Sequence, residues 1–286
     1  MKGIFAMPRS ISVALMLFLS PFWWPGLGQA RNLDVRNGKI ISDSQLIADL
    51  QGVRLIFIGE IHDNRWHHQV QLRILRGLHE AGVPLTVGLE MFRHDSQWAL
   101  DRWVNGTLSE GDFIQVFDNN WGMWPDYRAI FRYAREADLP MIGLNIGRNI
   151  TGQVASAGFS SLSPEQRREV PLVACDVDQT YQDYMHQVLG KFPHGGMSFH
   201  HFCEAQMVWD AVMAKNIIQY LGSHPDRTVV VLAGSGHSWK FGIPTQIHRH
   251  LQIPLRVVIP EIPGRLDRGN VTPAEADYLV LPDAGR

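Results

Sequence analysis

Short continuous runs of apolar residues, alternating with longer amphipathic stretches, constrain the fold of this chain more than any other feature. The six runs occupy residues 55–58, 85–87, 141–144, 228–233, 255–259 and 278–281. Strands that are buried on both faces have continuous apolar sequences, whereas half-buried strands alternate apolar and polar residues. The runs therefore predict the strands of a mainly parallel β-sheet.

Amphipathic patterns between the runs predict helices over residues 66–81, 126–138 and 198–221. Their apolar residues recur every three or four positions, which places them on one helix face. Residues 150–197 contain more Gly, Ser and Pro and no clear strand, so we expect a helical insertion there. Strands that alternate with helices predict an α/β fold, with a mainly parallel β-sheet flanked by helices.

Residues 1–30 have the features of a signal peptide. A basic start and an apolar run precede Gly28-Gln29-Ala30, a small-x-small cleavage site. A retained membrane anchor is the alternative, but Pro21 and Pro25 interrupt a run that must otherwise reach roughly 20 apolar residues to span a bilayer. We therefore expect export to the periplasm, with residues 31–286 as a single domain. No Cys lies near the cleavage site, which argues against a lipid anchor.

The charge and the cysteines of the mature chain give limited information about partners. The whole chain has a net charge of −2, and loss of the two basic residues of the leader, Lys2 and Arg9, makes it −4. This balance gives no basic surface of the kind that binds nucleic acid. Cys175 and Cys203 are either bridged in an oxidising compartment or are two small buried apolar residues.

Polar residues follow four of the predicted strands at the point where each strand ends. Ligands of open α/β sheets bind beyond the carboxyl ends of the strands, so these residues are the candidates for a site. They are Glu60 and His62 after the first run, Glu90 after the second, Asn145 and Arg148 after the third, and His237 after the fourth. Any one of them alone is better explained as a turn or capping residue. Four strand exits that carry Glu, His, Glu and His together favour a functional site.

Further candidates lie on the predicted helices. His200 and His201 share a helix face with Glu204, an arrangement that suits either a metal site or a solvated helix start. Tyr127 opens a helix at the same edge of the sheet, and a phenolate can bind ferric haem iron. Ordinary core packing is the alternative for Tyr127, and equally for Tyr184 in the insertion.

Several segments of the chain together resemble a known family. They are, in order, Gly59-Glu-Ile-His-Asp-Asn64, Gly88-Leu-Glu-Met-Phe92, Leu144-Asn145, His201-Phe-Cys-Glu-Ala-Gln206 and Ala233-Gly-Ser-Gly-His237. The first and the last are quite specific, and the resemblance runs from about residue 55 to residue 251. The chain is similar to the ChaN-like haem-binding, iron-regulated proteins.

This resemblance implies an α/β domain that binds haem at a homodimer interface and acts in bacterial haem or iron uptake with other uptake components. The family binds haem iron through a Tyr that a His assists, and Arg side chains can meet the propionates. The candidate haem-binding residues here are Tyr127, Tyr184, His200, His201, Arg93 and Arg148. Family members are often lipoproteins, whereas this chain lacks the lipid-bearing Cys, so we expect a soluble periplasmic carrier.

The same resemblance offers a hydrolase as the alternative function. The family looks distantly related to Tiki-type metal-dependent proteases and erythromycin esterases, which use Glu and His at these strand exits. Glu60, His62, Glu90 and His237 match that pattern and would hold a divalent metal such as manganese or zinc that activates a water. A third interpretation, a dimeric scaffold with a relic pocket, is also left open.

Overall fold

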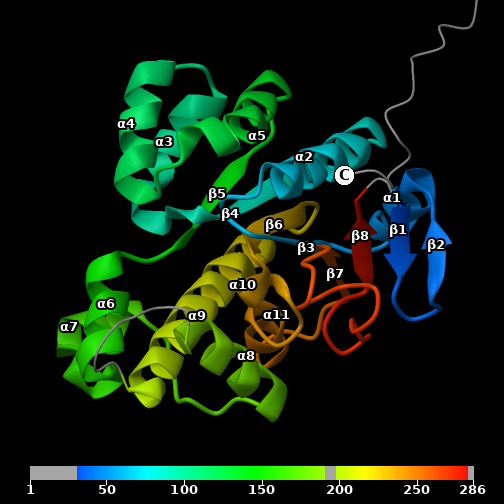
Figure 1. Cartoon of the computed structure of the whole chain (residues 1–286). Helices are drawn as coiled ribbons and strands as arrows, with labels where there is room; N and C mark the ends of the chain where they lie inside the picture. Colours follow the sequence, from blue (N-terminus) through cyan, green and yellow to red (C-terminus); the bar gives the residue numbers. More distant parts are fainter. Residues whose placement is uncertain (1–30, 191–197, 283–286) are drawn as a thin grey trace, which may run out of the picture.

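A computed structural model describes residues 31–190 and 198–282 of the chain (Figure 1). The signal peptide expected over residues 1–30 and the end of the insertion expected over 150–197 lie outside these residues. Within them, eight strands form one sheet in the order β2-β1-β8-β7-β3-β6-β4-β5. The strands are β1 Arg31–Asp34, β2 Lys39–Ile41, β3 Leu55–Glu60, β4 Leu85–Arg93, β5 Met141–Asn145, β6 Thr228–Gly234, β7 Leu255–Pro260 and β8 Tyr278–Leu281.

The centre of the sheet is parallel, as the continuous apolar runs predict. Strands β8, β7, β3, β6, β4 and β5 pair in parallel, whereas β1 pairs antiparallel with both β8 and β2. The six predicted strands are confirmed, and β1 and β2 are additional. The mainly parallel α/β fold is therefore correct, with one antiparallel edge.

Helices cover both faces of the sheet (Figure 1). On β3, Ile56 and Ile58 join one buried apolar cluster, and Leu55 and Phe57 join the other. The first cluster is covered by α1 Asp43–Leu50, α2 Arg65–Glu80, α3 Gln97–Val104, α4 Glu110–Asn120 and α5 Trp124–Glu136. The second is covered by α8 Gln179–Gly190, α9 Phe199–Ser223, α10 Ser235–Ser238 and α11 Ile243–His248. The three predicted helices correspond to α2, α5 and α9.

The described part of the predicted insertion is helical. It contains α6 Arg148–Ala157, a 3₁₀ turn at Phe159–Ser161 and α7 Pro164–Glu169, and it continues into α8. Val154 and Leu162 pack with Val208 of α9 in a third apolar cluster. A disulfide between Cys175 and Cys203 ties the segment before α8 to α9. No described helix combines the length and the apolar character that crossing a membrane needs.

Candidate functional site

The carboxyl ends of β3, β4, β5 and β6 meet at one edge of the sheet, beside a cavity of about 1060 Å³. The end of α4, the start of α6 and Trp209 of α9 complete its walls. Of the six residues predicted at the strand exits, five line this cavity, namely His62, Glu90, Asn145, Arg148 and His237. The sixth, Glu60, lies buried behind His62, so the structure brings the six together.

Glu60 is the last residue of β3, and its carboxylate is buried among donors. One carboxylate oxygen accepts a hydrogen bond from His62 Nδ1 at 2.8 Å and another from the hydroxyl of Tyr127. The other oxygen lies 3.3 Å from His68 Nε2. Burial opposes the charged carboxylate, but the bonds from His62 and His68 outweigh it and hold the pKa of Glu60 well below its ordinary value. Glu60 does not cap α2, because Asn64 does so.

His62 lies between Glu60 and the cavity. Because its Nδ1 bonds to Glu60, its Nε2 is the ring nitrogen on the cavity side. The ring packs edge-on against Trp121, with centroids 4.9 Å apart, and its Nε2 edge lies against Gly234. A Cβ at Gly234 would lie 3.2 Å from that nitrogen, so glycine at the end of β6 leaves the space that the imidazole of His62 occupies. Burial disfavours the charged ring, but Glu60 and Glu90 raise the pKa of His62 overall.

His237 lies across the cavity edge between two carboxylates. Its Nδ1 bonds to Asp210 of α9 at 2.6 Å, and its Nε2 lies 3.7 Å from Glu90. Glu90 in turn accepts the backbone N–H of Gly234 at 2.6 Å. Burial disfavours the charged imidazole, but the charges of Glu90 and Asp210 outweigh it and raise the pKa of His237 to about 9.

The tyrosines near this edge differ in how their hydroxyls are used. Tyr127 is fully buried, and burial followed by the charge of Glu60 raises its pKa far above the ordinary value. Tyr181 is also buried and donates to Asp210 at 2.7 Å. Tyr184 is half-buried with its oxygen against Gly236, and no hydrogen bond to that oxygen is present among the described residues. All six tyrosines of the chain lie in the described ranges, and none lines the cavity.

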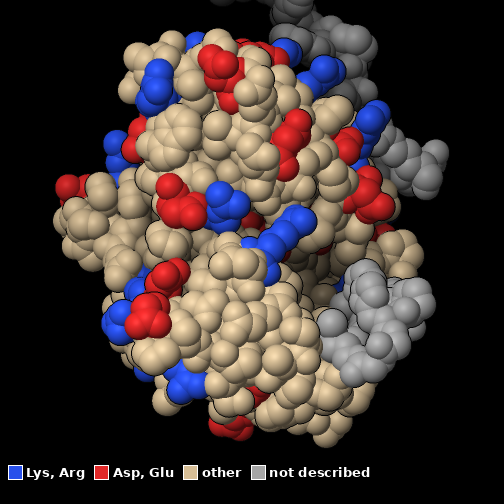
Figure 2. All heavy atoms as spheres, turned by 90° about the vertical axis from the view of Figure 1, so that its left-hand side faces the viewer, with Lys and Arg blue, Asp and Glu red and all other residues tan. Residues whose placement is uncertain are grey.

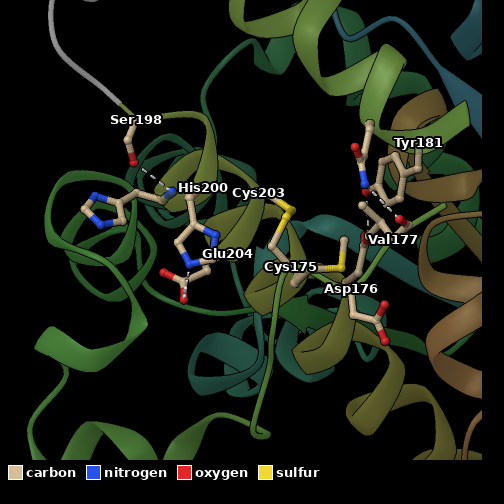
Figure 3. The surroundings of a disulfide bond; sticks show 12 residues. Cys175, Asp176, Val177, Tyr181, Ser198, His200, Cys203 and Glu204 are labelled. Atoms are coloured by element: carbon tan, nitrogen blue, oxygen red, sulfur yellow. Dashed lines mark hydrogen bonds and ion pairs between the residues drawn. A yellow bond between two sulfur atoms is a disulfide. The ribbon is translucent and has the colours of Figure 1, made fainter. Parts of the chain in front are cut away.

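The start of α9 is a separate cluster. His200 Nε2 lies 3.3 Å from Glu204, which accepts the backbone N–H of Phe159 at 2.8 Å. The ring of His201 packs against Gly158. Figure 3 shows His200 and Glu204 on one side of the disulfide and Tyr181 on the other. No hydrogen bond joins these histidines to Tyr127 or Tyr184 in the described part of the chain, and their role toward a ligand stays a prediction.

Two arginines that line the cavity are partly exposed. Arg148, at the start of α6, places its guanidinium 5.6 Å from the centre of the Trp121 ring. Arg93, at the end of β4, pairs with Asp95 at 3.0 Å. Figure 2 shows this side of the molecule, where basic and acidic side chains lie together along the furrow between its upper and lower halves. Cations at this rim can meet an anionic group on a ligand.

Asp210 and His68 are site residues that the sequence reasoning did not select. Asp210 lies seven residues after Cys203, on the otherwise apolar buried face of α9, and a carboxylate in such a pattern is the signal that could have found it. His68 follows Glu60 by only eight residues, but the contact between their side chains cannot be predicted without the fold. Within residues 31–190 and 198–282, no three His, Cys, Asp or Glu side chains are arranged to hold a metal ion. The described structure therefore gives no support to the divalent-metal alternative.

Comparison with known proteins identifies the relatives of this architecture. The chain aligns with ChaN of Campylobacter jejuni, a structure of cofacial haem binding, at 21% identity and a TM-score of 0.69, over 88% of this chain and 96% of that chain. It aligns with an erythromycin esterase variant in its open conformation at 14% identity and a TM-score of 0.50, over 81% of this chain and 76% of that one. No curated protein sequence matches it. Residues 46–247 match the family described as "Haem-binding uptake, Tiki superfamily, ChaN", and the chain belongs to this family.

Proposed function

We propose that this chain is a periplasmic haem-binding protein that acts in haem uptake or trafficking. Membership of the haem-binding uptake family supports the ligand class. The cavity at the carboxyl edge of the sheet supports the location, because it lies where ligands of open α/β sheets bind. Its volume of about 1060 Å³ is just above the roughly 300–1000 Å³ typical of small-molecule sites.

The residues around the cavity suit a porphyrin. Trp121 and Trp209 offer flat apolar surfaces, which a macrocycle can pack against. Arg93 and Arg148 lie at the same cavity and would pair with the two propionates of haem. The flat apolar body and the two carboxylates of haem therefore both find partners in one site.

Tyr184 is our proposed ligand of the haem iron. The observation that carries this assignment is that the hydroxyls of Tyr127 and Tyr181 donate to buried carboxylates, whereas the hydroxyl of half-buried Tyr184 has no hydrogen-bond partner among the described residues. Burial raises the pKa of Tyr184, and the guanidinium of Arg265, 4.0 Å from the centre of the ring, opposes that shift. The oxygen of Tyr184 lies against Gly236, the neighbour of cavity-lining His237.

The location in the periplasm has two independent supports. The first thirty residues have the pattern of an export signal. The disulfide between Cys175 and Cys203 is a feature of proteins that fold in oxidising compartments.

A homodimer is the proposed binding form. The related ChaN structure is described as binding haem cofacially. A second copy would cover the haem face that a single cavity leaves open to solvent. Sedimentation of the mature protein with and without hemin measures this, and we expect the dimer to be favoured by haem.

The experiment that tests the proposal is a titration of hemin into residues 31–286, followed by visible absorption. We expect a saturable Soret shift with a charge-transfer band of phenolate-bound iron in the wild-type protein. Tyr184→Phe should lose that band. The matched control is Tyr133→Phe, which should leave the spectrum unchanged, since the Tyr133 hydroxyl bonds to His79 of α2 and Tyr133 does not line the cavity.

Two results would contradict different parts of the proposal. A non-saturating titration of the wild-type protein would reject haem binding. A full phenolate spectrum in Tyr184→Phe would reject the assigned ligand but not haem binding, and Tyr127→Phe would then be measured in the same way.

A hydrolase is the second candidate, favoured by the pairing of His237 with Asp210 beside the cavity. A carboxylate that holds one ring nitrogen of a histidine prepares the other for acid–base chemistry. Ester hydrolysis by the haem-free protein that is lost in His237→Gln and retained in Tyr184→Phe would favour this function.

A further inference from the structure

The segment that leads into α8 is attached to α9 by a covalent bond. Residues 171–178 form no helix or strand, and Leu172 within them is 90% exposed. Cys175 is half-buried and bonds to Cys203, which is fully buried on α9 (Figure 3). Val173 and Val177 of this segment also pack against the apolar cluster that contains Cys203, so the disulfide adds a covalent attachment to an irregular, partly buried segment.

A second attachment follows six residues later and reaches the functional site. Tyr181 is buried, and its hydroxyl donates to Asp210 at 2.7 Å. The other carboxylate oxygen of Asp210 accepts from His237 Nδ1 at 2.6 Å. Both oxygens of this fully buried carboxylate are therefore used, one by the insertion and one by the cavity-lining imidazole.

The two attachments lie on the same face of α9. Cys203 and Asp210 are seven residues apart, which is two helical turns or about 10 Å along the axis. Met207 lies between them and is buried with Tyr181 and Met185 in one apolar cluster. The insertion thus docks along one stripe of α9, with a disulfide at one end and a hydrogen bond to the site at the other.

We propose that Tyr181 is a positioning residue for His237, acting through Asp210, and that the Cys175–Cys203 disulfide keeps Tyr181 docked, so that the haem site is completed only in the oxidised protein. Loss of the hydroxyl leaves one buried oxygen of Asp210 without its donor, and the carboxylate is then free to rotate away from His237. Loss of the disulfide frees the segment that carries Tyr181. This inference deepens the proposed haem function, but its first test does not depend on haem.

The first test is nuclear magnetic resonance of the haem-free mature protein. The bond from His237 Nδ1 to Asp210 should give a downfield, slowly exchanging imidazole proton, assigned by its loss in Asp210→Asn. We expect this signal to broaden or disappear in oxidised Tyr181→Phe, which keeps the ring and removes only the hydroxyl. Tyr220→Phe is the matched control, because Tyr220 bonds to Thr86 away from the site. An unchanged signal in Tyr181→Phe overturns the positioning role.

The second test addresses the disulfide through amide hydrogen exchange. In the double variant Cys175→Ala/Cys203→Ala we expect faster exchange at residues 179–186, and a weakened His237 signal, while β3 and β6 keep their protection. Equal exchange of residues 179–186 with and without the disulfide overturns its role. If the double variant fails to fold, the wild-type protein treated with dithiothreitol is measured instead, and the Tyr181→Phe result stands on its own.

Hemin affinity connects the inference with the proposed function. We expect about tenfold weaker binding in Tyr181→Phe, the effect of one hydrogen bond to a charged group. If the wild-type protein binds no hemin, the proposed function fails, whereas the resonance and exchange results still decide the positioning inference. Unchanged affinity in Tyr181→Phe with an altered His237 signal would show that His237 is positioned by Tyr181 but does not contribute to haem binding, which contradicts the link to the haem site.

Discussion

Two buried carboxylates, Glu60 and Asp210, define the chemistry at the scale of single residues. Each is held by an imidazole that borders the cavity, His62 for Glu60 and His237 for Asp210. A buried charge is costly unless it is paired and hydrogen-bonded, so removal of one partner is far more damaging than loss of an exposed ion pair. The site therefore contributes to the stability of the fold as well as to binding.

The raised pKa of His237 predicts a pH dependence of stability. Its pKa rises from an ordinary 6.5 to about 9 in the folded protein, so the folded state holds a proton that the unfolded state releases. The resulting stabilisation is complete below about pH 6.5 and is lost as the pH rises through about 9. We expect the free energy of unfolding to fall by on the order of 3 kcal/mol over this range. Urea unfolding at a series of pH values measures it.

His237→Gln is the variant that isolates this effect, and exposed His224→Gln is its control. The decline between pH 6.5 and 9 should be clearly smaller in the first variant, where only the raised pKa of His62 still contributes, and should persist in full in the second. An identical decline in all three proteins would show that other groups cause it.

The sequence predicts this site in part. Glu60, His62, Glu90 and His237 each follow an apolar run, so their common location follows from the rule for parallel sheets. Asp210 could not be placed beside His237 in the same way, because 27 residues separate them and their contact depends on how α9 packs on the sheet.

At the scale of elements, the two strands β1 and β2 at one edge of the sheet could not be predicted from the sequence. The central strands are buried on both faces and have a strong apolar signal. By contrast, β1 and β2 are short and partly exposed, so their sequences resemble loops. The order of the strands in the sheet also cannot be predicted from the sequence, because neighbours such as β3 and β6 are far apart in the chain. Pairing of this kind is a tertiary property that local patterns do not carry.

Strand β5 is the other edge of the sheet, and a side chain covers it. The amide of Gln97 donates to the carbonyl of Met141 at 2.7 Å and accepts from the N–H of Gly143 at 2.9 Å, as a neighbouring strand would. Such cover prevents an edge from pairing with another chain. We expect Gln97→Ala to lower the free energy of unfolding by about 1–2 kcal/mol. It should also promote concentration-dependent self-association, measured by sedimentation.

Gln219→Ala is the control for this prediction. Gln97 and Gln219 both line a groove beside β5, but Gln219 is exposed. If Gln97→Ala sediments like Gln219→Ala and the wild-type protein at every concentration, the edge is protected by other means.

At the scale of the whole molecule, the residues that line the cavity come from several segments of the chain. The lining comes from His62 just after the end of β3, from β4, the end of β5, the end of α4, the start of α6, α9 and α10. The helices on one face of the sheet and the insertion on the other therefore meet only in the folded chain (Figure 1). The family resemblance predicts what such a cavity binds. Its walls, and the absence of a hydrogen bond to the Tyr184 hydroxyl within the described ranges, become known only with the fold.

The most direct test of the central claim is resonance Raman spectroscopy of the hemin complex, excited in the charge-transfer band. Haem bound through Tyr184 predicts enhanced tyrosinate modes in the wild-type protein and in Tyr133→Phe, and their absence in Tyr184→Phe. A wild-type hemin complex without tyrosinate modes would contradict the phenolate ligand, and failure to form any saturable complex would contradict haem binding itself.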